Sequence, residues 1–543
     1  MRDVEVPVLI VGGSLVGLST SLFLGVHGVE HLVVERHRGT AIHPRAAFLM
    51  QRTVELFRWS GVEREVVEAA EREFVQNGAI MAVESLSGRE LQWFFRNIND
   101  GVEHLSPSPR IFVTQIGLEP VLRERAADLG GQLRYSSEVT SLTVEDDGVT
   151  AEVRDRTSGE EWTVRAQYAV AADGVRSPLR HQLGIGMRGH GTFSDSITIY
   201  FRADVRPLLG DRNLSVIYVV NPRLQGFFRF SIDGQAGFLV VNTAVDADGQ
   251  RTTTVGATAT EEDCVRYVRE ALGAPDLAVE IEDVQRWNAA AEWAERFGAG
   301  RVLLAGDAAH VMPPTGGYGG NTGVHDAHNL AWKLAYVLAG HSGPELLATY
   351  EPERLEVARL TVEQAYTRYV TRLDPGLGTE GLMPLIDDAL IDLGYRYRSP
   401  AFTPDRADDA DPEWEDPRTP TGRPGFRMAH VPVRRNGSEL STLDLVGTAP
   451  VLLTGPDGAG WARAGREAAA GLSLPLDVHS VGDAIEVEDE RFLPAFGIGR
   501  DGAVLVRPDG FVAWRSPGAD DDAKRIVEAA LARSVGRTVD GGV

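Results

Sequence analysis

The sequence predicts an α/β protein with a doubly wound first domain, an inserted domain built on a β-sheet, and a small α/β domain at the C-terminal end. Three observations predict this fold class. Residues 7–35 follow the pattern of a strand, a glycine turn, a helix and a second strand, as in the opening βαβ unit of a parallel sheet. Residues 190–290 are rich in short alternating strands. Residues 399–424 have the composition of a linker, after which strands and helices resume.

The length of 543 residues is too great for one compact core, so we expect about three domains. The doubly wound domain is placed at residues 1–185 and 291–398, with the sheet domain of residues 186–290 inserted between its two parts. Residues 399–424 form the linker, and residues 425–535 the third domain. The hydrophobic fraction of 43% and the charged fraction of 24% are those of ordinary globular chains, which allows a large buried interior.

The first domain is expected to begin with a strand at Pro7–Val11, a helix at Leu15–Val26 and a strand at His31–Glu35. The runs Leu133–Val144 and Val149–Val153 alternate apolar and polar residues, with Gly and Asp at their ends. This pattern predicts an antiparallel excursion from the parallel sheet.

Shorter patterns predict the elements of the two later domains. In the inserted domain, the expected strands are Ser196–Phe201, Leu214–Val220, Gly226–Phe230 and Gly237–Asn242. In the third domain, the expected strands are Val451–Thr454, Val504–Val506 and Phe511–Trp514, and the expected helices are Trp461–Ala470 and Ala523–Ser534. The former set predicts a sheet, and the latter a small α/β unit.

The balance of charged residues argues against two classes of partner. The chain has 54 lysines and arginines against 78 aspartates and glutamates, a net charge of −24 that would repel a phosphate backbone or an anionic membrane surface. No stretch reaches the roughly 18 uncharged apolar residues of a membrane span. We therefore expect neither nucleic acid nor a membrane as a partner.

Cysteine usage and the N-terminal residues indicate a cytoplasmic protein. Cys264 is the only cysteine, which excludes an intrachain disulfide, a CxxC pair and a cysteine-rich metal site. The apolar run Val6–Phe23 is not expected to be a signal peptide, because Asp3 and Glu5 spoil a basic leader and glycines divide the run. No metal is expected.

A glycine-rich loop, Gly12-Gly13-Ser14-Leu15-Val16-Gly17, lies between the first strand and the first helix. Bare backbone amides there place a pyrophosphate on the helix N-terminus. Ser14 stands where a second glycine is usual; its Cβ narrows the approach, but its hydroxyl can donate a hydrogen bond. Glu35 closes the second strand about twenty residues on, where a carboxylate accepts hydrogen bonds from ribose hydroxyls. The pattern predicts dinucleotide binding, and the alternative is an ordinary βα turn.

A second glycine-rich segment follows the short strand Arg301–Leu304. It contains Gly306-Asp307 and the run Pro313–Gly323, and it leads into a helix expected at Asp326–Leu338. Glycines at this density let backbone amides approach a flavin ring and its ribityl chain, and the helix N-terminus favours negative charge on a reduced flavin. Asp307 can hold a ribityl hydroxyl; taken alone, a Gly-Asp pair before a helix is more often a cap.

Between these segments, the apolar strand Tyr168–Ala172 enters the turn Asp173-Gly174, which Arg176 and Arg180 follow. Such a turn is common, so by itself it is weak evidence for a functional site.

The three motifs in this order resemble those of the FAD-dependent aromatic hydroxylases, the single-component flavoprotein monooxygenases. The resemblance covers residues 6–359. Within that family the chain looks most like the polyketide hydroxylases of aromatic antibiotic pathways, such as the tetracenomycin and anthracycline hydroxylases, because a third domain similar to thioredoxin follows the linker. The stretch Leu505–Arg515 carries this last similarity.

The resemblance implies which residues bind FAD. The ADP half would lie on the glycine loop and the end of the second strand, at Gly12, Ser14, Leu15, Val16, Gly17, Glu35 and Arg36. The ribityl chain, the diphosphate and the adenine would be contacted by Arg45 in His43-Pro44-Arg45, by Gln115, by Val139, by Asp173 and by Asp307. The isoalloxazine ring would be lined by Pro314, Gly317, Gly320 and Asn321. Without the family context, it is equally consistent that Arg45 forms a surface salt bridge and that Gln115 is a solvated loop residue.

The resemblance also implies the reaction. NADPH or NADH would reduce the flavin, O₂ would add at flavin C4a, and the resulting hydroperoxide would hydroxylate a polycyclic phenol in antibiotic biosynthesis. Two alternatives stay open: a Baeyer–Villiger reaction on a similar substrate, and a non-catalytic flavoprotein that sequesters a reactive intermediate. The identity of the substrate, the preferred nicotinamide and the oligomeric state, including a homo-oligomer, are left open.

The substrate pocket is expected between the flavin and the sheet of the inserted domain. Tyr218, Phe228 and Phe230 are the candidates for contacting an aromatic substrate, and a hydrophobic core strand is the alternative. Arg372, near the end of a helix, is the candidate for polarising a phenolate. The sequence assigns no catalytic base.

Overall fold

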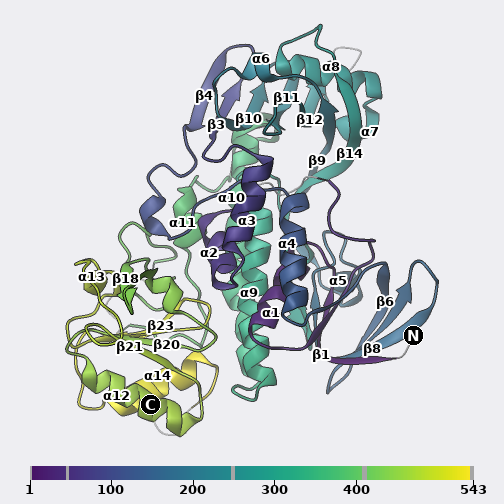
Figure 1. Cartoon of the computed structure of the whole chain (residues 1–543). Helices are drawn as coiled ribbons and strands as arrows, with labels where there is room; N and C mark the ends of the chain where they lie inside the picture. Colours follow the sequence, from purple (N-terminus) through teal and green to yellow (C-terminus); the bar gives the residue numbers. More distant parts are fainter. Residues whose placement is uncertain (1–2, 44–47, 246–250, 253, 406–411, 539–543) are drawn as a thin grey trace.

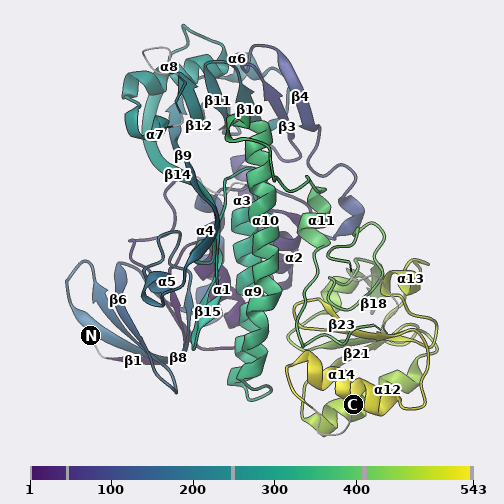
Figure 2. The same ribbon diagram turned by 180° about the vertical axis from the view of Figure 1, so that it is seen from behind.

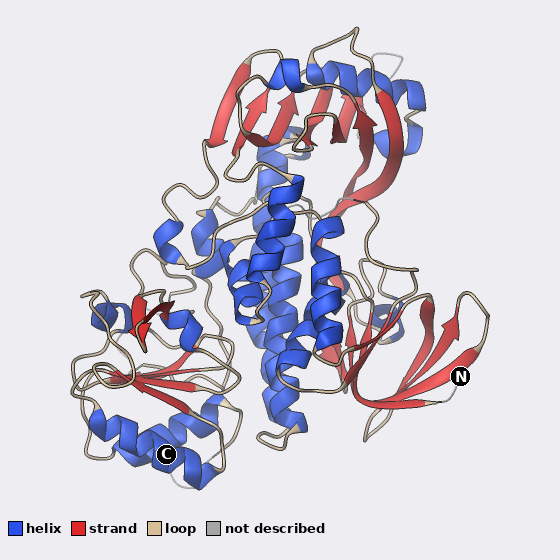
Figure 3. Cartoon of the chain, viewed as in Figure 1, coloured by secondary structure: helices blue, strands red, loops and turns tan. Residues whose placement is uncertain are grey.

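The computed structural model describes residues 3–43, 48–245, 251–252, 254–405 and 412–538. The strands gather in three main sheets, with helices between them (Figure 3). Two long helices stand at the centre, between the C-terminal domain and the sheet that holds the N-terminus (Figure 1). From behind, a third sheet lies over the upper ends of these helices (Figure 2). Within the described residues, we find no helix with the length and apolar character needed to cross a membrane.

The N-terminal sheet has eight strands. They are β1 (Val4–Val11), β2 (His31–Val34), β5 (Gln132–Arg134), β6 (Ser137–Val144), β7 (Val149–Asp155), β8 (Glu161–Ala171), β15 (Gly298–Ala299) and β16 (Val302–Leu304). The strands β16-β8-β1-β2-β5 are parallel neighbours. Val8, Leu9 and Ile10 of β1 are fully buried, as expected of a parallel strand covered on both faces. The doubly wound prediction is therefore confirmed.

The antiparallel excursion is also present, as β6 and β7 pair beside β8. One detail differs from the prediction. The expected run Leu133–Val144 is divided into β5 and β6, because Ser136 takes a positive φ of 53° and breaks the extended backbone.

The second sheet has nine strands. They are β3 (Ala79–Val83), β4 (Glu90–Phe95), β9 (Met187–Arg202), β10 (Leu214–Val220), β11 (Leu224–Phe230), β12 (Ala236–Val245), β13 (Arg251–Thr252), β14 (Glu280–Ala294) and β17 (His310–Val311). Helix α8 (Glu261–Leu272) packs on one face of this sheet and forms a core with it, near the short helices α6 (Arg206–Leu209) and α7 (Val255–Thr258). The opposite face is turned toward the long central helices (Figure 1).

The second sheet crosses the expected boundary between residues 185 and 186. β3 and β4 come from the first part of the chain, yet β3 pairs in parallel with β10, where Met81 lies opposite Ile217. Both side chains are fully buried in the core under α8. The apolar residues of β3 thus complete this core, and the expected inserted domain of residues 186–290 lacks three of the strands in its sheet, β3, β4 and β17.

Helices fill the space between the sheets. They are α1 (Leu15–Val26), α2 (Gln51–Trp59), α3 (Glu63–Glu73), α4 (Gln115–Asp128), α5 (Pro178–Gln182), α9 (Tyr318–Leu338), α10 (Tyr350–Arg372) and α11 (Asp388–Leu393). Helix α1 has the predicted bounds. Helix α9 begins at Tyr318, eight residues before the expected start at Asp326, because Gly317 takes φ +72° and turns the chain directly into the helix. Three predicted loop glycines, Gly319, Gly320 and Gly323, are therefore helical.

The C-terminal domain has a thioredoxin-like sheet, as predicted. Its elements are β18 (Pro432–Arg435), β19 (Ser438–Ser441), β20 (Val451–Thr454), α12 (Ala459–Leu472), β21 (Asp477–Ser480), α13 (Phe492–Phe496), β22 (Ala503–Val506), β23 (Val512–Ser516) and α14 (Ala523–Ser534). The main sheet has the order β21-β20-β22-β23, in which β20 and β21 are parallel and β22 and β23 antiparallel. The bounds of β20 and α14 match the prediction.

The expected linker 399–424 is partly packed rather than loose. Phe402 is 7% exposed and joins a small core with Val357 of α10, Tyr397 and Phe511 of the C-terminal domain. The ring of Phe511 stacks on that of Tyr397, with 4.0 Å between centroids. Aromatic burial of this kind binds the C-terminal domain to α10.

Two buried charge clusters also join the C-terminal domain to the helices. In the α10 charge cluster, Arg507 donates to both oxygens of Glu353 at 2.7 and 2.8 Å, and Lys333 of α9 donates to the same carboxylate at 2.7 Å. All three side chains are fully buried. Burial lowers the pKa of Lys333 to about 8, against the attraction of Glu353.

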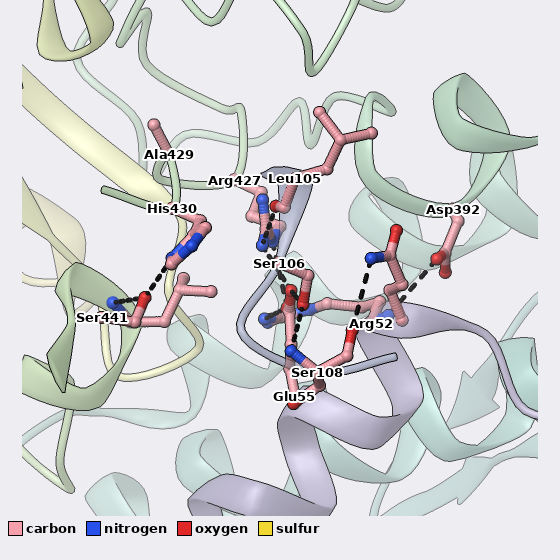
Figure 4. Close-up of polar contacts among 12 residues, drawn as sticks. Arg52, Glu55, Leu105, Ser106, Ser108, Asp392, Arg427, Ala429, His430 and Ser441 are labelled. Carbon is pink, nitrogen blue, oxygen red and sulfur yellow. Dashed lines mark hydrogen bonds and ion pairs between the residues drawn. The ribbon is translucent and has the colours of Figure 1, made fainter. Parts of the chain in front are cut away.

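The α2 charge cluster comprises Arg52 and Glu55 of α2, Ser106, and Arg427 of the C-terminal domain (Figure 4). Glu55 accepts hydrogen bonds from Arg52 and from Nε of Arg427, both at 3.0 Å, and from Ser106 Oγ at 2.6 Å. Arg52 also reaches the backbone oxygen of Asp509 at 2.5 Å. Each buried carboxylate therefore depends on an arginine from the third domain.

Candidate functional site

The three sequence motifs meet in space. A methyl group on Gly12 would lie 2.2 Å from the backbone oxygen of Ala172, at the entry to the Asp-Gly turn. A methyl group on Gly306 would lie 2.6 Å from Cγ2 of Val16, and one on Gly323 would reach the same atom at 2.6 Å. These contacts are shorter than any side chain tolerates, so glycine is required where the segments cross.

Glu35 lies at the end of β2 and holds the glycine loop. It is 7% exposed, and its two oxygens accept hydrogen bonds from the backbone amides of Gly13 at 2.6 Å and His37 at 2.7 Å. A carboxylate anchored in this way keeps the loop closed against the start of α1. The contact to ribose hydroxyls stays a prediction.

Ser14 has a partner that the sequence did not reveal. Its hydroxyl donates to Oε1 of Glu119 on α4 at 2.5 Å, and the backbone amide of Ala41 donates to Oε2 at 2.7 Å. Gln115, one turn earlier on α4, reaches the Ser14 hydroxyl at 3.5 Å. Burial raises the pKa of Glu119, while the bond from Ser14 opposes this rise. Ser14 therefore couples the loop to α4, which explains its place in the motif.

Asp173 is bound within its own turn. Oδ1 accepts from the Ser177 hydroxyl at 2.6 Å, and Oδ2 accepts from the amide of Leu179 in α5 at 3.1 Å. Burial raises the pKa of Asp173, and the bond from Ser177 lowers it. Arg180 donates to the backbone oxygen of Ala308 at 3.0 Å. The second motif is thereby joined to the Gly-Asp motif.

Asp326, inside α9, organises the Gly-Asp motif. It is fully buried and accepts hydrogen bonds from the amide of Gly306 at 3.0 Å, from His310 at 2.6 Å and from Arg354 of α10 at 2.7 Å. Burial would raise the pKa of Asp326, but the charges of Arg354 and His310 outweigh it and lower that pKa. Asp307 itself is exposed beside this network. The fixed backbone thus presents the Asp307 carboxylate outward.

The start of α9 is fixed by Asn321. Its Oδ1 accepts from the amide of Met50 at 2.9 Å, and its Nδ2 donates to the backbone oxygens of Phe48 at 2.9 Å and Gly317 at 2.7 Å. A methyl group on Gly317 would lie 2.9 Å from the ring of Phe48. Two predicted ring-lining residues, Gly317 and Asn321, therefore contact the segment of Phe48 and Met50 at the N-terminus of a 21-residue helix.

The other predicted cofactor contacts are placed as follows. Leu15 is buried, Arg36 and Pro314 are exposed, and Val139 and Gly320 are half-buried. Arg45 lies outside the described residues. Within these residues, no group of histidine, cysteine or carboxylate side chains has the arrangement of a metal site.

Two substrate predictions are corrected. Phe228 and Phe230 are 1% and 7% exposed and belong to the core beneath α8, on the face of the sheet away from the central helices. Side chains alternate along a strand, so the prediction of a substrate contact at these two positions has the wrong face. Phe227, between them, points to the other side and packs near Tyr218.

Tyr218 and Arg372 do come together. Tyr218 pairs with Phe227 across β10 and β11 and lies near the C-terminal end of α10. The guanidinium of Arg372 stands 4.5 Å from the ring of Phe94 and 5.9 Å from that of Tyr218. An aromatic wall therefore faces the central helices, and the half-buried Arg372 at the end of α10 packs against it, an environment suited to a flat, electron-rich ring.

The geometry fits a dinucleotide cofactor. Glycines at the crossings bring backbone close on two sides, the helix starts of α1 and α9 supply amides, and carboxylates stand where hydroxyl groups need acceptors. The residues present fit the ADP and ribityl parts of FAD.

Comparisons with known proteins agree with this geometry. Residues 5–365 match the family model described as "FAD binding domain", and residues 421–538 match "Aromatic-ring hydroxylase, C-terminal". The chain is 51% identical to a 4-methyl-5-nitrocatechol 5-monooxygenase from Burkholderia sp, over 97% of both chains. It is 39% identical to tetracenomycin A2 monooxygenase-dioxygenase from Streptomyces glaucescens, over 99% of this chain and 98% of the relative.

A solved structure gives the same result. The crystal structure of aklavinone-11 hydroxylase in a ternary complex with FAD and aklavinone matches with a TM-score of 0.92 and 40% identity, over 99% of this chain and 100% of that one. Both family models and the whole-chain matches point the same way. The chain therefore belongs to the aromatic-ring hydroxylases and is an FAD-dependent monooxygenase.

Proposed function

We propose that this enzyme hydroxylates a phenolic ring of an aromatic polyketide, with NADPH or NADH and O₂ as co-substrates. The observation that carries the proposal is the aromatic wall of Tyr218, Phe227 and Phe94, with Arg372 against it. Flat polycyclic phenols bury well on such a surface. The relatives named as tetracenomycin and aklavinone enzymes support this substrate class.

The protein's contribution is binding, orientation and exclusion of water. When bound, FAD supplies the redox chemistry, taking electrons from NAD(P)H and activating O₂. Asp307 would hold the ribityl chain, Glu35 the adenosine ribose, and the α9 start the ring. Arg372 would favour the phenolate form of the substrate, which makes the ring more electron-rich.

A second substrate class is a small substituted catechol. The 51% identity over 97% of both chains to a nitrocatechol monooxygenase favours it. The same wall and the same arginine would bind a catecholate. The two classes differ in the size of the ring system, not in the chemistry asked of the site.

The test is oxidation of NADPH and NADH by the purified FAD protein, with naphthacene-type phenols and with nitrocatechols, alongside peroxide release and product mass. Stimulated oxidation with one oxygen atom added per turnover and little peroxide supports hydroxylation, and the better substrate decides between the two classes. An ester or lactone product would indicate a Baeyer–Villiger reaction instead. Tight ligand binding without stimulation would indicate a sequestering protein.

Replacing Arg372 by methionine is expected to lower kcat/KM by about 10²-fold, because a positioned charge near the developing phenolate is worth about 3 kcal/mol. Arg372→Lys keeps the charge and should recover part of that loss. Steady-state kinetics from pH 6 to 10 would measure both. An unchanged kcat/KM in Arg372→Met would remove this residue from the proposed site.

Replacing Asp307 by alanine should weaken FAD binding by about 1–3 kcal/mol, about 5- to 150-fold in Kd, because a ribityl hydroxyl loses its acceptor. Fluorescence titration of apoprotein with FAD measures this change. Asp146→Ala, in the turn between β6 and β7, is the control and should bind FAD normally. Full flavin affinity in Asp307→Ala would contradict the assigned contact.

A further inference from the structure

The short helix α11 contacts the starts of two other helices. Asp388 Oδ1 accepts a hydrogen bond from the hydroxyl of Tyr318, the first residue of α9, at 2.5 Å. Asp392 Oδ2 accepts from the backbone amide of Arg52 in the first turn of α2, at 3.3 Å (Figure 4). Two carboxyl groups one helical turn apart thus hydrogen-bond to the starts of α9 and α2, the segments that border the proposed flavin ring site.

Asp392 has an unusual environment for a carboxyl group. It is 2% exposed, and its second oxygen, Oδ1, has no hydrogen-bond partner within the described part of the chain. It lines a cavity of about 10 Å³, which has room for about one water molecule. The cavity is also lined by Met50, Tyr318, Asn321, Thr322 and His325. A small cavity with polar side chains beside an unbonded carboxyl oxygen can hold an ordered water.

Burial and the neighbouring charges together place the pKa of Asp392 close to neutral pH. Burial raises the pKa of Asp392 to about 7; Arg110, the α2 amide and Arg427 act against this rise, and Glu55 adds to it. His325, the imidazole in the same cavity, stays neutral because burial lowers its pKa well below the ordinary value. Asp392 is therefore the carboxyl group of this cavity whose charge changes near neutral pH.

The α9 start lies between this carboxyl group and the proposed ring site. Asn321 lines the cavity on one side and binds the backbone of Phe48 and Gly317 on the other. A helix N-terminus carries about half a positive charge and stabilises one nearby anion best. A charge on the reduced flavin and a charge on Asp392 would share this single helix end, so each disfavours the other.

We propose that Asp392 takes up a proton from solvent when the flavin is reduced and releases it when the flavin is reoxidised. The hydride from NAD(P)H brings two electrons and one proton and leaves one negative charge on the flavin. The second proton forms the O–H bond of Asp392 and offsets that charge across the α9 start. The inference rests on the proposed position of the flavin ring, and it does not depend on which phenol is the substrate.

The test is the midpoint potential of the bound flavin from pH 5.5 to 9, in the wild type and in Asp392→Asn. Asparagine has the same shape and carries no charge at any pH. Ionised Asp392 disfavours flavin reduction, so the wild-type potential should fall more steeply around pH 7 than that of the variant. The two potentials should agree at pH 5.5, and the variant should be the more positive at pH 8.5.

Unfolding of the holoenzyme gives a second readout. The pKa of Asp392 rises from 3.8 to about 7 on folding, so its contribution to stability is complete at low pH and is lost as the pH rises toward 7. Asp392→Asn lacks this loss. The unfolding temperature of the variant minus that of the wild type should therefore be more positive at pH 8 than at pH 5.

Asp388→Asn is the matched control, because it removes a carboxylate from the same helix that is paired with Arg368. Its potential should stay parallel to the wild-type curve across the whole pH range. Parallel curves for Asp392→Asn as well would overturn the proposal. So would a pH-dependent gain in stability of Asp392→Asn without any change in the potential curve, because Asp392 would then titrate independently of the flavin.

Discussion

Replacing Arg507 by methionine is expected to lower the free energy of unfolding by about 3–5 kcal/mol, because the change leaves a buried carboxylate without its principal partner. Glu353 would keep Lys333, Asn329 and Ser399 as partners, and Asp509 would lose the same guanidinium. Urea unfolding of the holoenzyme, followed by circular dichroism and by flavin release, measures the effect. The C-terminal domain should separate first, because its contact to α10 is the one weakened.

Arg500→Met serves as the control for this change. Arg500 pairs with Asp457 at 2.8 Å in the same domain, but the two side chains are 67% and 56% exposed. Exposed pairs contribute about 0–1 kcal/mol, so this variant should unfold almost like the wild type. If Arg507→Met matched it, the α10 charge cluster would have no net role in stability.

Replacing Asp326 by alanine is expected to remove most of the bound FAD. The change removes the carboxylate that pairs with the fully buried Arg354, and it removes the acceptor of the Gly306 amide. Leaving one buried charge without its partner lowers the free energy of unfolding by about 3–5 kcal/mol, and the backbone next to Asp307 loses the hydrogen bond that fixes it. The measurement is the ratio of 450 nm to 280 nm absorbance after purification, with FAD affinity measured at low temperature, where the variant is folded.

Glu356→Ala is the control for Asp326→Ala. Glu356 pairs with Arg359 on the exposed side of α10, at 39% and 58% exposure for the arginine and the glutamate. This variant should keep its flavin. A fully flavinated Asp326→Ala protein would show that the Gly-Asp motif holds its shape without the buried network.

The glycine motifs could be predicted from sequence because their requirements are local. A strand, a tight turn and a helix start within a few residues of one another, and Gly12 and Gly306 mark the crossings. The alternation of apolar residues likewise gave strands such as Leu214–Val220 with correct bounds. It did not give the orientation of each face, which depends on where α8 packs. For this reason the prediction of substrate contacts at Phe228 and Phe230 has the wrong face of the sheet.

The partners of the motifs could not be predicted because they are distant in the chain. Ser14 meets Glu119 across 105 positions, and Arg52 meets Asp392 across 340. A buried acid inside an apolar helix, such as Asp326, was the one available signal, since a lone carboxylate there needs a cation. Likewise, β3 has no feature that indicates its place in a distant sheet, and only its pairing with β10 explains it.

The two interdomain arginines limit how far the third domain can be exchanged between relatives. Arg427 and Arg507 are the second cations beside two carboxylates of α2 and α10, Glu55 and Glu353, which Arg52 and Lys333 pair with from the helical side. A chimera that brings in a foreign thioredoxin-like domain without both arginines would leave each of these buried carboxylates with one cation fewer. Grafts that keep an arginine at both positions are therefore expected to be the more stable ones.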